Sequence, residues 1–442
     1  MGGLVTFGLA ASAALVALLS RAHAIGLIGL VFVIHGILVL VIGASARNLP
    51  FFVAVCVVGL LIMLGRWKAP PPQQILLLLA LVLWMGLCVL LAPDEARAFF
   101  HYLRYAKAIA LALIVMAICY EADGYEIIAK FLLVGVMLGA AFNVYQDLTG
   151  QHLLYVGWDP EQSRAAGLRG DPNDTAMILL MGLPLAWYFY YSWRQLFWRL
   201  VAAIGFFLIA AAIVLTGSRA GGLVMVAVIG LLFVRRPSMA AAIAGGFLVL
   251  GMMFWVADAY WERMNTLIEG EAAFGGRSLA GRLTLLTQGL SIFSENPIFG
   301  VGVGHFGGAF RDSLAVLATG GTSRGGPVAH NFYLEVFVET GVVGGALFVT
   351  VLAMSVLGLR QLDLTTRPRG ARTPTLGFAL MAGLLGMLMM GMTLSQGHNS
   401  VLWFVVGLGL AARNISVELA SEGVGADSVR EPPVAVAPRI GS

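Results

Sequence analysis

Residues 75–92 have the sequence ILLLLALVLWMGLCVLLA, which contains no charged side chain. A helix that crosses the hydrocarbon core of a bilayer needs about 20 residues of this kind, because each residue advances it by only ~1.5 Å. No water is available in that core to satisfy backbone N–H and C=O groups, so a spanning segment of this composition must be helical. This stretch therefore predicts a transmembrane helix.

Similar apolar blocks recur along the 442-residue chain, of which 59% is hydrophobic and only 11% charged. A soluble domain is nearer half apolar and a quarter charged. The other predicted spans lie at residues 4–20, 24–43, 51–65, 106–120, 126–143, 174–191, 197–215, 220–234, 238–256, 331–357, 376–394 and 399–412. We expect an all-α polytopic membrane protein with about 12–13 transmembrane helices.

Charge, cysteine content and the N-terminal sequence limit further which kinds of membrane protein the chain can be. A net charge of +4 is small for this length, so we expect no nucleic-acid partner. The three cysteines all lie inside apolar blocks and lack a metal-ligand spacing, which argues against a disulfide framework. No basic stretch precedes the first apolar run, so residues 4–20 are interpreted as a retained span rather than a signal peptide.

Short basic loops predict how the spans are oriented, because Lys and Arg favour the cytoplasmic side. Basic residues near positions 66–68, 193–199, 235–236 and 360–372 then face the cytoplasm, although the same counting leaves the basic loop at 93–105 outside. The predicted organisation is N-terminal transmembrane helices (1–143), a periplasmic loop (144–173), transmembrane helices that carry a turn at Arg219 (174–256), a large periplasmic loop (257–329), C-terminal transmembrane helices (330–413) and a disordered cytoplasmic tail (414–442).

Residues 216–222, TGSRAGG, place Arg219 between two apolar spans on the predicted periplasmic side. A guanidinium beside backbone N–H groups at a helix start suits an anion such as pyrophosphate. The alternative is a tight turn in which Arg219 only anchors the span at the membrane interface.

A second arginine, Arg282, begins a stretch in which Leu283, Leu286, Leu290 and Phe293 recur at helical spacing. This pattern predicts an amphipathic helix that lies on the membrane surface or on the helix bundle and ends at the Asn-Pro pair of residues 296–297. Arg282 is either a binding residue or a solvated residue of the first turn.

Residues 300–307, GVGVGHFG, contain a formal G-x-G-x-x-G pattern. A dinucleotide site would need a preceding strand and a βαβ unit, neither of which fits a loop between membrane spans. We interpret the segment as a flexible or tightly packed backbone turn, in which His305 is a minor candidate for substrate contact.

The large loop meets the next span at residues 327–335, PVAHNFYLE. His330 stands at the helix start, where a neutral imidazole is favoured and can act as a general base. Asn331, Glu335 and Glu339 share one helix face, and carboxylates inside a span suggest function. Alternatively, His330 and Asn331 cap the helix, and the two glutamates pair with arginines in the bundle.

The predicted loop at 144–173 supplies two further arginines, Arg164 and Arg169, which could hold an anionic donor or simply lie in water. It ends in the sequence DPND at residues 171–174, which invites a metal-site interpretation. Helix entry explains it better, with Asp171 as N-cap and Pro172 at the first helical position.

Together and in this order, these features resemble the O-antigen ligase and polymerase superfamily over about residues 164–412. The resemblance rests on GSRAG at 217–221, Arg282 ahead of ENPIFGVG at 295–302, AHNFYLE at 329–335, ETG at 339–341 and the LWF helix near 402–404. It implies a GT-C-like membrane fold with one large periplasmic loop between late helices.

The resemblance also implies a glycosyltransferase of the bacterial inner membrane, with its active site facing the periplasm. Such an enzyme transfers a glycan from undecaprenyl pyrophosphate to an acceptor hydroxyl with inversion, and it needs no metal and no cofactor. His330 is the implied general base, and Arg219 and Arg282 are the implied partners of the pyrophosphate leaving group. The implied substrate-binding residues are Arg164, Arg169, Asn331, Glu335 and His305.

The acceptor is left open by the sequence. A ligase would use lipid A-core, a polymerase another O-antigen or exopolysaccharide repeat unit, and a protein O-oligosaccharyltransferase a serine hydroxyl. We favour the ligase slightly. Two other classes compete: a polysaccharide transporter or flippase, and a structural partner of an export complex. Membrane lipid is an expected partner in every case.

Overall fold

The computed structural model describes residues 20–42, 49–150, 171–237, 279–313, 328–367 and 374–428. All regular elements in these ranges are helical and none is a strand, so the prediction of an all-α protein is confirmed. The helices are α2 (Arg21–Val33), α3 (His35–Ile42), α4 (Leu49–Met63), α5 (Pro72–Leu90), α6 (Glu95–Ile118), α7 (Ala122–Thr149), α8 (Pro172–Ser192), α9 (Leu196–Leu215), α10 (Arg219–Arg235), α13 (Leu279–Glu295), α14 (Phe306–Asp312), α16 (Phe332–Thr366), α17 (Leu376–Met390), the 3-10 turn η3 (Gly391–Thr393) and α18 (Ser400–Ser428).

Within the described ranges, eight helices are long and apolar enough to cross a membrane. They fall in α5, α6, α7, α8, α9, α16, α17 and α18, and α2 and α4 are shorter apolar helices. The chain is therefore a multi-pass membrane protein. The spans predicted at 4–20 and 238–256 lie outside the described residues, so the expected total of 12–13 remains a prediction.

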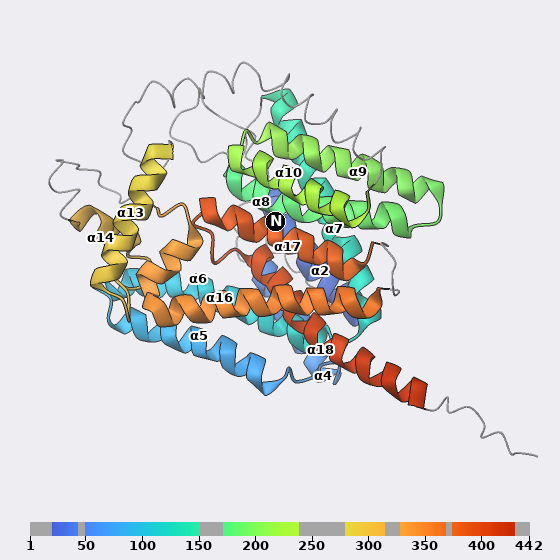
Figure 1. Cartoon of the computed structure of the whole chain (residues 1–442), viewed down its shortest axis with the longest axis horizontal. Coiled ribbons are helices and arrows are strands. Elements are labelled where there is room, and N and C mark those ends of the chain that lie inside the picture. Colours follow the sequence, from blue (N-terminus) through green and yellow to red (C-terminus); the bar gives the residue numbers. More distant parts are fainter. Residues whose placement is uncertain are drawn as a thin grey trace, which may run out of the picture.

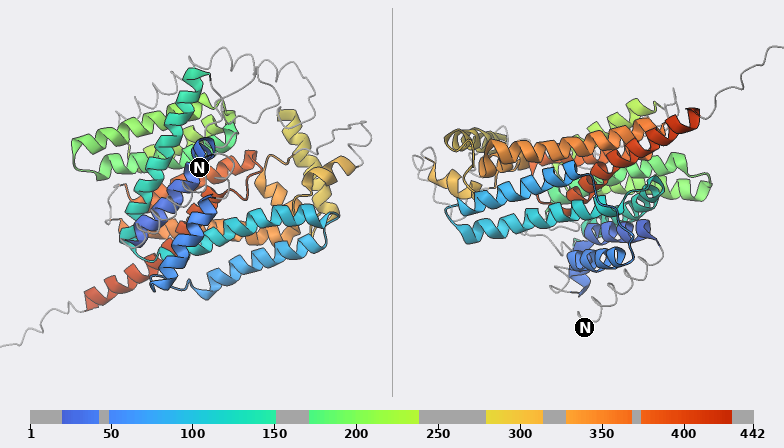
Figure 2. Two further views of the ribbon diagram at one scale, coloured as in Figure 1. Left: turned by 180° about the vertical axis from the view of Figure 1, so that it is seen from behind. Right: turned by 90° about the horizontal axis from the view of Figure 1, so that it is seen from below.

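The helices pack around α18, which is buried on nearly every side between residues 401 and 412. It packs against α16 and α6, while α17 packs against α8 and α8 against α9 (Figure 1). The apolar helices α2 and α4 lie together on one face of the bundle, where α2 also packs against α7 (Figure 2). A helix that is hydrophobic on all sides is the expected centre of such a bundle.

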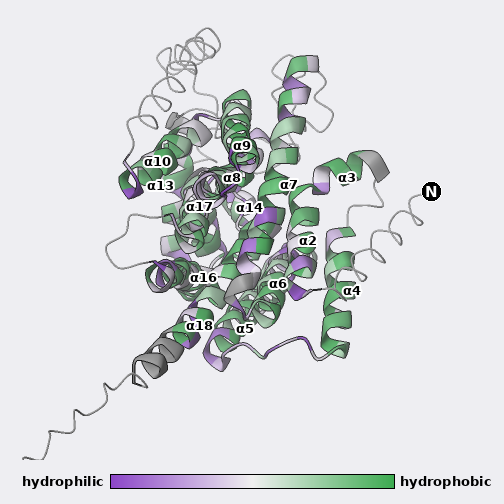
Figure 3. Ribbon diagram, turned by 90° about the vertical axis from the view of Figure 1, so that its right-hand side faces the viewer, coloured by the Kyte–Doolittle hydropathy of each residue, from purple (hydrophilic) through white to green (hydrophobic). Residues whose placement is uncertain are grey.

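The peripheral helices consist largely of hydrophobic residues, as the hydropathy colouring of the ribbon shows (Figure 3). On α5, Leu76, Leu83 and Leu90 recur every seventh residue and expose 64%, 71% and 68% of their surface. A leucine stripe of this kind would be unfavourable in water and is suited to lipid. The face of α5 that points away from the bundle is thus a lipid-facing surface.

Helix α16 is broken at Gly341, which has φ 69° and ψ −172°. The break frees three carbonyl groups, and each finds a donor from another segment. The carbonyl of Val338 accepts from Val301 N–H at 2.9 Å, that of Glu339 from Gly302 N–H at 3.0 Å, and that of Thr340 from Trp84 Nε1 at 2.8 Å. The kink therefore has an identifiable cause and leaves no backbone acceptor of the break unsatisfied.

Three predicted boundaries differ from the structure. The span predicted at 24–43 is divided at Ile34 into α2 and α3. Helix α7 continues to Thr149 and ends on the left-handed Gly150, which shortens the predicted 144–173 loop. The 257–329 loop contains α13 and α14 within its described part.

The C-terminal tail predicted as disordered from 414 also differs, because α18 continues to Ser428. Good helix formers follow the membrane segment, including Glu418 and Leu419, and a helix that is already nucleated extends through them readily. Glu418 additionally pairs with Lys68, which lies after α4. Residues 429–442 lie outside the described ranges.

Gly341→Ala should destabilise the protein by more than about 2 kcal/mol, because the new methyl group would meet the Ile298 carbonyl and the residue would have to keep a positive φ. Thermal unfolding of the purified protein in detergent measures the effect. Gly230→Ala in α10 is the matched control, since a methyl group there meets no atom within 4 Å. Equal melting temperatures for the two variants would contradict the assigned role of Gly341.

Candidate functional site

The predicted helix entry at residues 171–174 is confirmed. Asp171 is the N-cap of α8, and its Oδ1 accepts the N–H groups of Asn173 at 2.7 Å and Asp174 at 3.1 Å. Pro172 occupies the first helical position, where its missing N–H causes no loss.

The turn before α10 is built around Gly217, whose φ of 60° reverses the chain. Ser218 then caps α10 by accepting Gly221 N–H at 3.0 Å, and its hydroxyl donates to Asn173 Oδ1 at 2.7 Å. Arg219 follows as the first residue of the helix and its side chain is exposed. The same serine therefore caps α10 and fastens its start to the start of α8.

The start of α18 is tied to the same place by a buried pair. Asn399 Nδ2 donates to Asp174 Oδ1 at 2.8 Å, and Asn399 Oδ1 accepts the N–H groups of Val401 and Leu402. Both Asn399 and Asp174 expose only 5% of their surface. A buried polar pair of this kind is stabilising only when both members are satisfied, so it fixes α18 against α8 in one arrangement.

The fourth helix start at the site is that of α16. Asn331 is its N-cap and accepts the N–H groups of Tyr333 at 3.0 Å and Leu334 at 3.1 Å, as one of the two sequence interpretations predicted. Its role in substrate binding stays a prediction.

His330 precedes this cap and has φ 48°, and no other non-glycine residue in the described ranges has a positive φ. Its N–H donates to Ser395 Oγ at 3.0 Å. A left-handed backbone at a histidine costs about 1 kcal/mol and persists only where its surroundings hold it.

Arg282 is half-buried in the first turns of α13. Burial lowers the pKa of its guanidinium below the ordinary value, and the nearby positive charge of Arg219 lowers that pKa further. Burial likewise lowers the pKa of His330, the charge of Arg282 adds to this effect, and the carboxylate of Asp171 opposes it. Arg282 therefore lies within electrostatic range of both Arg219 and His330, and His330 also lies within range of Asp171.

Helix α13 packs on the bundle, as one of the two predicted locations requires, but the leucines singled out in the sequence are not the ones it buries there. Leu283 and Leu290 each expose 52% of their surface, whereas Leu285 and Ile292 are buried against the start of α16. Gly289 lies between them and leaves room for Leu334. Leucines occupy both faces of the helix, so their periodicity could not distinguish the buried face from the exposed one.

The glycine-rich segment at 300–307 is tightly packed, which is one of the two alternatives that the sequence left open. Gly300, Gly302 and Gly304 all have positive φ, and a methyl group on Gly302 would lie 2.6 Å from Ala92 Cβ. Arg97, on α6, donates to the Gly304 carbonyl at 3.1 Å. The turn therefore binds the kink of α16 on one side and α6 on the other.

His305 lies inside this scaffold, with 8% of its surface exposed. Its Nδ1 bonds to the Val303 carbonyl at 3.0 Å, and the next N–H, that of Phe306, donates to Glu339 Oε1 at 3.1 Å. Glu339 thus anchors the start of α14. The alternative that the two glutamates pair with arginines is not seen, because among the described residues neither Glu335 nor Glu339 forms an ion pair with an arginine. A substrate contact for His305 or Glu335 stays a prediction.

The predicted contributions of Arg164 and Arg169 fall on residues outside the described ranges. The sequence did not point to Ser395, which belongs to the polar segment SQGHNS at 395–400 between two apolar spans. A cluster of polar residues between α17 and α18 was the available signal. The electrostatic influence of Asp171 on His330 was also missed, because the sequence explained Asp171 fully as a cap.

The fold and the site define the class: a multi-pass all-α membrane protein in which Arg219 begins α10, His330 precedes α16, and Arg282 on α13 lies within electrostatic range of both. Residues 204–349 match the family described as O-antigen ligase. That segment contains all three residues, and the match confirms the resemblance of this part of the chain to the O-antigen ligase superfamily, with a function of the ligase or polymerase type. No curated protein matches the chain.

Ser395→Ala should speed hydrogen exchange at the His330 amide by about 2- to 10-fold, because a hydrogen bond worth ~0.5–1.5 kcal/mol is lost. Mass spectrometry of peptides covering residues 328–334 measures it. Ser395→Thr should restore slow exchange, and Ser294→Ala is the control, since that hydroxyl bonds only locally, to the Ser291 carbonyl. Unchanged exchange in Ser395→Ala would show that another contact holds His330.

Proposed function

We propose that this protein transfers a glycan from undecaprenyl pyrophosphate to an acceptor hydroxyl on the periplasmic face of the bacterial inner membrane. The observation that carries the proposal is the grouping of Arg219, Arg282 and His330 at the convergence of four helix starts. Two permanent cations and a neutral base in one polar site are what this transfer requires.

The leaving group is the lipid pyrophosphate. When the acceptor oxygen bonds to the anomeric carbon, the bond from that carbon to the phosphate oxygen breaks and its electron pair stays on the pyrophosphate. The guanidinium groups of Arg219 and Arg282 are suited to stabilise this growing negative charge. The N-terminus of α10 adds a positive partial charge beside Arg219.

The acceptor hydroxyl must lose its proton during the attack, and His330 is the proposed base. Because its pKa is lowered, the imidazole is neutral at neutral pH and has a lone pair to accept that proton. A single displacement of this kind inverts the anomeric centre. The scheme needs no metal ion, because the arginines neutralise the leaving group. It needs no nucleotide sugar, because the lipid pyrophosphate of the donor is itself the leaving group.

The remaining substrate contacts are proposed for Arg164, Arg169, Asn331, Glu335 and His305. For the acceptor we favour lipid A-core, which makes the protein an O-antigen ligase. An O-antigen or exopolysaccharide polymerase and a protein O-oligosaccharyltransferase share the same donor chemistry and differ in the hydroxyl that attacks.

His330→Ala should lower transfer by about 10²–10⁴-fold, as expected for loss of a general base. Arg219→Ala and Arg282→Ala should each lower it by about 10²–10³-fold. Surface polysaccharide, measured in cells that contain equal amounts of each variant, reports the effect. Normal polysaccharide with well-produced His330→Ala protein would refute the assignment of the base.

Two exposed residues remote from the site provide matched controls for these variants. His23 lies on α2 and Arg360 near the end of α16. His23→Ala and Arg360→Ala should leave the polysaccharide unchanged. If all three site variants behave like these controls, the result would favour the alternative that the protein is a structural partner of an export complex.

Asp171→Asn should shift the acid limb of the pH–rate profile to lower pH, by up to about one unit. The sign follows from the charge: Asp171 raises the pKa of His330, so removing its carboxylate lowers that pKa further and the base stays neutral in more acidic solution. Asparagine preserves the N-cap of α8. The transfer rate of purified protein between pH 4.5 and 8, a range spanning the ordinary histidine pKa of about 6.5, measures the shift. A shift to higher pH would contradict the scheme.

The glycolipids of a deletion strain distinguish the acceptors. Accumulated long lipid-linked polymer with bare lipid A-core identifies a ligase, as we predict. Core capped by a single repeat unit identifies a polymerase and overturns the choice of acceptor while keeping the donor chemistry.

A further inference from the structure

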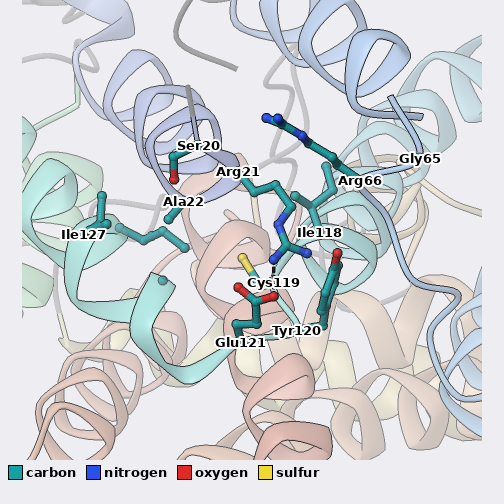
Figure 4. Close-up of a pocket in the computed structure, with 12 residues that line it drawn as sticks. Ser20, Arg21, Ala22, Gly65, Arg66, Ile118, Cys119, Tyr120, Glu121 and Ile127 are labelled. Carbon is teal, nitrogen blue, oxygen red and sulfur yellow. Dashed lines mark hydrogen bonds and ion pairs between the residues drawn. The ribbon is translucent and has the colours of Figure 1, made fainter. Parts of the chain in front are cut away.

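A cavity of about 500 Å³, drawn in Figure 4, lies at the opposite end of α6 from the glycine-rich turn that follows α13. Helix α6 connects the two regions: Arg97 near its start bonds to the glycine-rich turn, and Ile118 at its end lines the cavity. A helix of 24 residues is ~36 Å long, which is close to the thickness of a membrane. The cavity is therefore separate from the proposed catalytic site.

Two arginines and one carboxylate line this cavity. Arg21 pairs with Glu121, and its guanidinium lies over the Tyr120 ring at 3.9 Å (Figure 4). Arg66 lines the cavity from the chain that follows α4. With two guanidinium groups and one carboxylate, the charged side chains of the lining have a surplus of positive charge.

One donor in the lining lacks an acceptor. Arg21 Nη1 is buried and makes no hydrogen bond among the described residues. A buried N–H of a charged group without a partner is unfavourable, and the guanidinium that carries it belongs to the lining of the cavity. The phosphate group matches the guanidinium in both charge and hydrogen-bond geometry.

The surface beside the cavity is that of a membrane interface. At the end of α4, Met63, Leu64 and Trp67 expose 85%, 42% and 47% of their surface, and Arg66 and Lys68 lie among them. Apolar side chains next to tryptophan and basic residues are typical of the boundary between acyl chains and headgroups. A soluble anion would need the cations but not the adjoining apolar surface.

We propose that this cavity binds the headgroup of an anionic phospholipid, with the phosphate on Arg21 and Arg66 and the acyl chains along the exposed end of α4. The short basic loops place this end of the bundle at the cytoplasmic leaflet, where basic pockets between transmembrane helices attract anionic lipids. The lipid would fasten α2, α4, α6 and α7 together, since residues from the ends of all four or their connecting turns line the cavity.

The test is native mass spectrometry of the full chain after incubation with dioleoyl phosphatidylglycerol, dioleoyl phosphatidylcholine or inorganic phosphate. We expect one phosphatidylglycerol to be retained at least about 10-fold more strongly than phosphatidylcholine, and phosphate alone not to compete. The double variant Arg21→Gln/Arg66→Gln should lose this preference, whereas Arg360→Gln, which changes an exposed arginine outside the cavity, should keep it.

Equal retention of the two lipids by the wild-type protein would overturn the proposal, and so would an undiminished preference in the double variant. Displacement of phosphatidylglycerol by inorganic phosphate would identify a soluble anion as the ligand instead. The comparison of lipids uses the wild-type chain, so the proposal remains testable if the double variant does not fold. The single variant Arg66→Gln, which leaves the ion pair between Arg21 and Glu121 intact, should then show a reduced preference.

Discussion

The buried hydrogen bond between Asp174 and Asn399 is the contact on which the geometry of the site depends. Asp174 lies in the first turn of α8, and Asn399 caps α18, the central helix of the bundle. Ser218 joins the start of α10 to α8 through Asn173, and Ser395, just before α18, holds the backbone of His330. Four helix starts are thus held together by polar side chains in or beside them, and Arg219 and His330 lie at two of these starts.

The break in α16 provides the second constraint. Its freed carbonyl groups hold the glycine-rich turn, and the turn follows directly after α13, which carries Arg282. The backbone hydrogen bonds of this turn and the packing of Leu285 and Ile292 against the start of α16 therefore fix α13, which carries Arg282, relative to the helix that follows His330. Such preorganisation is what allows fixed charges to act on a leaving group without a reorganisation penalty.

Much of this architecture is predictable from the sequence, because apolar blocks and caps are local signals. The transmembrane helices and the caps Asp171 and Asn331 follow from composition and from residues within four positions of each other. The face that α13 buries does not, because leucines occupy both faces and only the packing of Leu334 against Gly289 decides between them. Ser395 and His330 are 65 residues apart, so their contact is a property of the fold alone.

The central claim is that this protein breaks the bond between a glycan and a lipid pyrophosphate. The most direct test is purified protein in proteoliposomes that contain a lipid-linked glycan with a labelled pyrophosphate and an acceptor glycolipid. The account predicts glycosylated acceptor and free labelled lipid pyrophosphate in equal amounts, and neither product with His330→Ala. Recovery of the glycan still joined to its lipid, whether unmoved or transferred to the other leaflet, would contradict it.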